Sequence, residues 1–100
     1  MKPKVRVRVT EDFGRDLSAQ TTYLVGADHA DWAVRLIDEV ERVIGTLATH
    51  PEVGVLEIPS RGIRKLVLPK LPLVVRYAWR SSAREVVVLR LFHARQKRMG

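Results

Sequence analysis

The sequence predicts a two-layer α+β domain over residues 1–100, with the element order β-α-α-β-β-β. Three observations predict it. Valines alternate with polar residues near the N-terminus, apolar residues then recur at three- and four-residue steps, and three runs rich in valine and leucine close the chain. The length suffices for one small hydrophobic core and not for two. We therefore expect an N-terminal strand, an antiparallel helical hairpin and a three-stranded antiparallel meander, with the helices covering one face of the sheet.

The first strand and both helices are expected in the N-terminal half. Residues 5–10 alternate valine with arginine and threonine, which is the period of a strand with one buried face. A first helix is predicted over 11–24, because Thr10 can cap it and acidic residues fill its first turn. A second, more clearly amphipathic helix is predicted to be capped by Asp28 and to end before Pro51, since proline disfavours helical geometry in the preceding residue. The short link between them predicts a hairpin.

The C-terminal half is expected to form a loop and then the meander. Residues 50–62 contain two prolines and two glycines and are predicted to be a loop. Three strands are predicted to follow, at Ile63–Leu68, Leu73–Arg80 and Glu85–Phe92. The connections between these strands are four residues long, which suits hairpins.

Positive charge is concentrated in the C-terminal part. The chain holds 18 Lys and Arg against 11 Asp and Glu, a net charge of +7. Residues 1–60 carry seven basic and ten acidic side chains, a net charge of −3, whereas residues 61–100 carry eleven basic side chains and one acidic, Glu85, a net charge of +10. This asymmetry predicts an anionic partner for the C-terminal part, either nucleic acid or protein.

Strand alternation predicts which side chains of the last two strands face the helices. Wholly apolar sets are expected beneath the helices, and sets that contain arginine are expected on the open face. The covered group comprises Leu73, Val75, Tyr77 and Trp79, with Val87, Leu89, Leu91 and finally His93 from the last strand. The open-face group comprises Val74, Arg76, Ala78 and Arg80, with Val86, Val88, Arg90 and Phe92 from the last strand.

The open face is thus expected to carry three arginines, Arg76, Arg80 and Arg90, joined by Arg64 or Lys65 of the preceding strand. Such a surface can dock an acidic protein segment or a phosphate backbone. The alternative is that the arginines form only a solvated outer face of the sheet without a binding role. The residue types leave both interpretations open.

Few catalytic arrangements are compatible with the composition. Without cysteine, disulfides, thiolate metal sites and a cysteine nucleophile are excluded. His29, His50 and His93 fall on different predicted elements, so no metal site is expected. The glycines are isolated and form no phosphate loop, and we expect no cofactor. Only His93, flanked by Arg90 and Arg95, could stabilise a phosphoryl transition state and move a proton.

Membrane and export segments are not expected. The first nine residues are basic but alternate, and they lack the continuous apolar run of a signal peptide. No apolar stretch approaches the length of a membrane-spanning helix. A soluble cytoplasmic protein without a membrane partner is the expectation.

The C-terminal half resembles the RelE/ParE toxin superfamily, and within it the ParE-like branch. The resemblance is carried by Ile63–Leu68, Pro72–Tyr77 and Glu85–Arg95, and the final strand with His93 and Arg95 is its most specific part. It extends over nearly the whole chain, including the Asp16–Leu17 pair in the first helix. The resemblance implies the toxin half of a type II toxin–antitoxin module, neutralised by a cognate ParD-like antitoxin in a hetero-oligomer.

Two mechanisms exist in this superfamily. ParE-like members inhibit DNA gyrase, whereas RelE-like members cleave messenger RNA on the ribosome. Ribonuclease members tend to carry an arginine where this chain has Val74, and often a tyrosine after His93, which is absent here. These differences favour a toxin that inhibits gyrase by binding to it and catalyses no reaction itself. The endoribonuclease remains the alternative, and a plain nucleic-acid-binding domain is a third. The acidic residue usual after the His-x-x-Arg ending of ParE relatives is replaced by Gln96.

Three groups of candidate site residues follow from the resemblance and the sheet faces together. Antitoxin binding is assigned to Arg64, Arg76, Arg80 and Arg90. Contact with gyrase or another target is assigned to His93, Arg95, Lys97 and Arg98. For the nuclease alternative the catalytic candidates are Arg76, Arg90 and His93.

Overall fold

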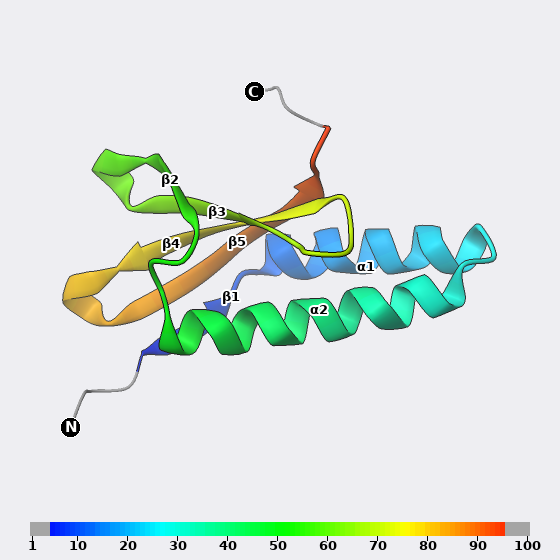
Figure 1. Ribbon diagram of the computed structural model, residues 1–100, viewed down its shortest axis with the longest axis horizontal. Helices are drawn as coiled ribbons and strands as arrows, with labels where there is room; N and C mark the ends of the chain where they lie inside the picture. Colours follow the sequence, from blue (N-terminus) through cyan, green and yellow to red (C-terminus); the bar gives the residue numbers. More distant parts are fainter. Residues whose placement is uncertain (1–4, 96–100) are drawn as a thin grey trace.

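Two helices lie against one face of a five-stranded sheet in the computed structural model, which describes residues 5–95 (Figure 1). The elements are β1 (Arg6–Val9), α1 (Glu11–Gly26), α2 (Ala30–Thr49), β2 (Val55–Ile58), β3 (Ile63–Val67), β4 (Leu73–Arg80) and β5 (Glu85–His93), with short 3-10 turns η1 (Pro59–Arg61) and η2 (Ser81–Ala83). The predicted α+β class and the order of a strand, a helical pair and then strands are confirmed. One strand was missed, because β2 lies within the segment predicted to be a loop.

The strand order is β1-β5-β4-β3-β2, so the first and last strands of the chain are neighbours. β1 runs parallel to β5, from Arg6 opposite Glu85 to Val9 opposite Val88, and the other three pairs are antiparallel. β1 is shorter than β5 and pairs only with its first half. The second half of β5 is therefore without a strand partner on that side, and α1 lies beside it instead.

The helix boundaries differ from the prediction at two points, the end of α1, which extends to Gly26 instead of residue 24, and the cap of α2. α1 begins as expected, with Thr10 Oγ1 accepting a hydrogen bond from the Phe13 amide at 3.1 Å. The same hydroxyl donates to the carbonyl of Leu89 at 3.0 Å, which fixes the start of the helix on β5. The prediction that Asp28 caps α2 was wrong: Asp28 has a φ of 67° in the left-handed region of the turn, and His29 occupies the cap position. The end of α2 at Thr49 is as predicted.

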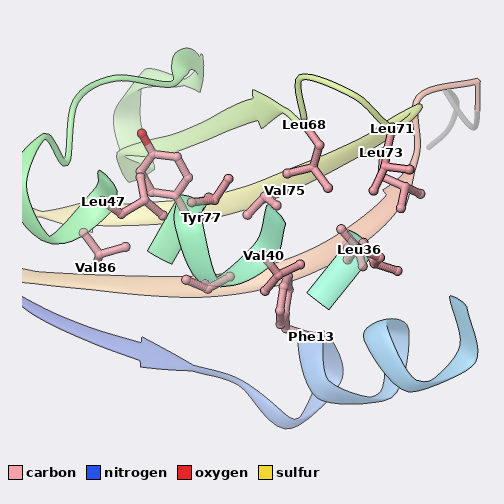
Figure 2. Close-up of a cluster of buried hydrophobic side chains, with 13 residues drawn as sticks. Phe13, Leu36, Val40, Leu47, Leu68, Leu71, Leu73, Val75, Tyr77 and Val86 are labelled. Carbon is pink, nitrogen blue, oxygen red and sulfur yellow. The ribbon is translucent and has the colours of Figure 1, made fainter. Parts of the chain in front are cut away.

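The hydrophobic core lies between the two helices and the covered face of the sheet. Figure 2 shows the side chains of α1, α2, β4, β5 and the β3–β4 connection meeting there. Its fully buried members include Phe13, Leu36, Leu47, Leu68, Val75, Tyr77, Val86 and Val88. One acidic side chain lies at the margin of this packing: Glu39 of α2 is only 5% exposed.

Tyr77 connects the core to the segment that precedes β2. Its hydroxyl accepts a hydrogen bond from the Gly54 amide at 2.8 Å and donates one to the Pro51 carbonyl at 2.9 Å. Burial raises the pKa of this phenol, which keeps it protonated and able to donate. A side chain at position 54 would meet the hydroxyl, since an ideal Cβ lies 2.7 Å from Tyr77 Oη. The glycine is therefore required by this close approach.

A β-bulge in β5 reverses the predicted faces of the first half of that strand. Tyr77 pairs with Val88, but the adjacent Arg76 pairs with Arg90, so Leu89 is an extra residue on β5. One inserted residue exchanges the two faces of a strand on one side of the bulge, because side chains alternate with a period of two. The regular alternation assumed from the sequence gave no sign of it.

The expected placement of four β5 side chains was therefore wrong. Val86 and Val88, expected on the open face, are fully buried in the core beneath the helices. Val87 and Leu89, expected beneath the helices, belong to a small apolar cluster on the open face. Beyond the bulge the predicted alternation holds, and Leu91 lies in the core.

Candidate functional site

The sheet face that no helix covers contains a shallow hollow of about 650 Å³, which we call the open-face hollow. Its floor is aliphatic and comes from three adjacent strands: Ile63 of β3, Ala78 of β4, and Val87 and Leu89 of β5. Its charged lining residues are three arginines: Arg8 of β1, Arg61 of η1 and Arg80 at the end of β4. The bulge in β5 creates this floor, because it turns Val87 and Leu89 away from the helices.

The arginines around the open-face hollow differ in their partners. Arg8 contacts Glu85 at 3.3 Å, an exposed ion pair of the kind that contributes little to stability. The guanidinium groups of Arg61 and Arg80 make no hydrogen bond or ion pair with any residue between 5 and 95. The hollow therefore offers two uncompensated guanidinium groups beside an apolar floor.

Arg76, one of the predicted antitoxin-binding residues, points to the open face but already has a partner. Its guanidinium donates to both carboxylate oxygens of Glu57, at 2.8 and 3.2 Å, and lies 4.8 Å from the centre of the Phe92 ring. The hydrogen bond from Arg76 lowers the pKa of Glu57, which keeps that carboxylate ionised. Lys65 adds a longer contact to the same carboxylate at 3.9 Å.

Arg90 also has a partner within the chain. Its Nε and Nη2 donate to the two oxygens of Asp16 in α1, at 2.7 and 3.1 Å. The Leu91 amide donates to Asp16 as well, at 2.9 Å, so the carboxylate replaces the strand partner that β5 lacks beyond β1. Burial alone raises the pKa of Asp16, but these hydrogen bonds outweigh it and leave the pKa below its ordinary value.

Arg64 is placed apart from the other three arginines. It pairs in register with Tyr77, so it extends from the side of β3 that faces the helical layer. There its Nη1 donates to the carbonyls of Glu52 and Gly54, at 3.0 and 2.8 Å. Its role in the structure is to hold the loop before β2. Of the two candidates on β3, it is Lys65 that lies on the open face, opposite Arg76.

The residues of the nuclease alternative do not come together. His93 pairs in register with Leu73, a core residue, so its side chain extends on the helix side of the sheet. Arg76 and Arg90 extend on the other side. His93 Nδ1 accepts a hydrogen bond from the Arg95 amide at 3.2 Å, which shapes the turn after β5. Lys97 and Arg98 lie outside the described residues.

Sequence reasoning missed four side chains that define the charge of this face. Arg8 alternates with valines in the sequence, so its position on the open face was available as a signal. The other three side chains carried no comparable signal. Arg61 reaches the face from the turn η1 and Asp16 from helix α1, and Glu57 lies on the strand that was missed.

Two other kinds of functional feature are absent from residues 5–95. Within that range no group of three or more histidine, aspartate and glutamate side chains is placed to hold a metal ion. Neither of the two helices in the same range is long and apolar enough to cross a bilayer.

Comparison with known proteins identifies the family. Residues 7–98 match the family described as the ParE toxin of the type II toxin–antitoxin system parDE. The chain belongs to the ParE toxin family. The resemblance to ParE toxins noted in the sequence is thereby confirmed, and membership in such a system implies an antitoxin as the toxin's partner.

A solved structure has the same fold as this toxin. The chain is similar to a chain of the chromosomal ParDE toxin–antitoxin system from P. aeruginosa, with 20% sequence identity and a TM-score of 0.72. The similarity covers 89% of this chain and 95% of the other. No curated protein matches the toxin.

Proposed function

We propose that this toxin inhibits DNA gyrase by binding to it in the cytoplasm, and that a cognate ParD-like antitoxin relieves the inhibition. The observation that carries the proposal is the separation of the groups that the alternative activity needs. A ribonuclease using Arg76, Arg90 and His93 requires all three to meet the same phosphate. His93 extends on the helix side of the sheet and both arginines on the open side.

The ion pairs of the two arginines support the same conclusion. Arg76 is neutralised by Glu57 and Arg90 by Asp16, each through two hydrogen bonds. A carboxylate within hydrogen-bonding distance lowers the electrostatic benefit that an arginine can give to a phosphoryl transition state. Binding to a protein target does not require these groups to be unpaired, because the exposed edges of such pairs can still accept further contacts.

We assign the contact with gyrase to the end of β5 and the residues after it. His93 and Arg95 are the described members of this region, and Lys97 and Arg98 continue it in sequence. Antitoxin binding is assigned to the open face, through Arg76, Arg80 and Arg90. His93 extends from the helix side of the sheet and the three arginines from the open side, so in the proposed hetero-oligomer with the antitoxin, His93 and the antitoxin need not compete directly.

The test is an assay of gyrase supercoiling on relaxed plasmid with the purified toxin, run beside an assay of messenger RNA cleavage on ribosomes. We expect loss of supercoiling with the messenger RNA left intact. Cleavage of ribosome-bound messenger RNA without any effect on gyrase would overturn the proposal in favour of the endoribonuclease.

Two charge reversals test the proposed contact surface. Arg95→Glu should weaken gyrase inhibition by about tenfold, because it reverses a charge at the target surface. Arg35→Glu, which makes the same change of net charge on α2, should leave inhibition within about twofold of the parent protein. Equal losses in both variants would show that only the total charge matters and that the end of β5 is not the contact.

A further inference from the structure

The open-face hollow has the chemistry of a peptide-binding site. The outer face of a one-sided sheet is ordinarily polar. Here Ile63, Ala78 and Val87 form a continuous aliphatic floor, packed against Leu89. A hollow of about 650 Å³ over such a floor is within the size range of ligand-binding clefts.

A further aliphatic side chain extends this floor toward the edge of the sheet. Ile58 of β2 pairs with the floor residue Ile63 and is 40% exposed. An exposed apolar surface that continues from a hollow is typical of a surface covered by another chain.

The charges around the open-face hollow select an acidic partner. All three charged side chains that line it are arginines. Arg61 and Arg80 have no partner among residues 5–95, in contrast to Arg76 and Arg90, which are paired with Glu57 and Asp16. A carboxylate can therefore bind at the hollow without displacing an existing ion pair.

The floor distinguishes a peptide from a nucleic acid. Single-stranded nucleic acids bind to surfaces on which their bases stack against aromatic rings. The four floor residues are aliphatic. Trp79 contributes to the lining, but it pairs with the buried Val86 and packs into the core on the helix side, so its ring offers no stacking surface on the open face.

We propose that the open-face hollow anchors an acidic, aliphatic segment of the antitoxin. One branched aliphatic side chain of that segment lies on the floor, and flanking carboxylates bind Arg61 and Arg80. The inference rests on the proposed neutralisation by an antitoxin and narrows it, because it places the anchor at Arg61 and Arg80 rather than at the two arginines that already have partners.

The test uses a fluorescently labelled synthetic peptide that alternates leucine with glutamate, with binding followed by fluorescence anisotropy. Two further peptides separate the contributions, one with serine in place of leucine and one with lysine in place of glutamate. Labelled oligothymidylate is the nucleic-acid probe. We expect binding of the first peptide only. Equal binding of the serine peptide would overturn the role of the floor, and binding of oligothymidylate alone would identify a nucleic-acid site instead.

Matched variants locate the site. The double reversal Arg61→Glu with Arg80→Glu should weaken binding of the leucine–glutamate peptide by at least about tenfold. The control Arg35→Glu with Lys70→Glu makes the same change of net charge on the helix side and should change affinity by less than about twofold. Equal losses in the two doubles would refute a localised site. Ala78→Leu should fill the floor and weaken binding, with circular dichroism confirming that the variant is folded.

A parallel gyrase assay separates this inference from the proposed function. The Arg61→Glu, Arg80→Glu double should still inhibit supercoiling, because neither residue belongs to the proposed target surface. If the parent protein binds the peptide as expected but does not inhibit gyrase, the gyrase proposal fails and the anchor site remains. If gyrase is inhibited but no peptide binds, the anchor site is refuted.

Discussion

Removing the hydroxyl of Tyr77 tests how the segment before β2 is held. Tyr77→Phe keeps the buried ring but removes the bond accepted from Gly54 and the bond donated to Pro51. Each of these hydrogen bonds contributes about 1 kcal/mol to the free energy of unfolding. Leaving the buried Gly54 amide without an acceptor costs about 1 kcal/mol more. The expected loss in the free energy of unfolding is therefore about 2–3 kcal/mol. For a domain of this length, that lowers the melting temperature by about 10–20 °C.

Urea denaturation and thermal melting measure this loss, and Tyr23→Phe is the matched control. Tyr23 is 68% exposed, so removing its hydroxyl should change stability by less than about 0.5 kcal/mol. Hydrogen exchange gives a second, local measurement, since the Gly54 amide should exchange slowly in the parent protein and much faster in Tyr77→Phe. Equal stability of the two variants would refute the argument that the buried hydroxyl fixes the loop.

Three further predictions concern the charges and backbone of the same molecule. Asp16→Asn should destabilise the protein by about 1 kcal/mol at neutral pH. Because the folded pKa of Asp16 is lowered, its contribution to stability is present above the ordinary aspartate range and is lost as the pH falls through the folded pKa. Urea denaturation at low pH should therefore show a smaller difference in stability between the variant and the parent protein. A difference independent of pH would contradict this. Glu39→Met should raise the free energy of unfolding by about 1 kcal/mol, because Oε1 of this buried carboxylate has no hydrogen-bond partner within residues 5–95. A lower free energy of unfolding, measured by chemical denaturation, would show that the carboxylate is stabilising. Gly62→Ala should lower the melting temperature, because φ is +64° and the new Cβ would lie 2.7 Å from a carbonyl oxygen of β4. Gly14→Ala, in open space on α1, should raise the melting temperature. Shifts of the same sign would argue against backbone strain at position 62.

The sequence predicted the layers of the fold better than the surface of the sheet. Periodicity was sufficient for both helices and for β3, β4 and β5, because their apolar residues recur at helical spacing or in short strand-length runs. β2 was missed because it is a short edge strand between residues rich in proline and glycine, where turn signals outweigh a four-residue run. Its pairing with β3 depends on contacts with residues outside β2, so the sequence of β2 alone does not predict it.

The candidate site was predicted in part, for a related physical reason. Alternation placed Arg76, Arg80 and Arg90 on one face, and the register agrees. It could not predict the carboxylates that neutralise two of them, because Asp16 and Glu57 come from elements whose approach to the sheet is set by tertiary packing. Nor could it predict the hollow, which exists only because one extra residue in β5 redirects the strand before it.

The parallel pairing of β1 with β5 has a consequence for the synthesis of the toxin. β1 is made first, yet within residues 5–95 its only strand partner is β5, the last strand. The sheet cannot close until residues 85–93 have left the ribosome, and contacts of such long sequence separation form slowly. A growing chain therefore passes through translation without a closed sheet, and a chain that stops before β5 never acquires the floor of the open-face hollow, to which Val87 and Leu89 contribute.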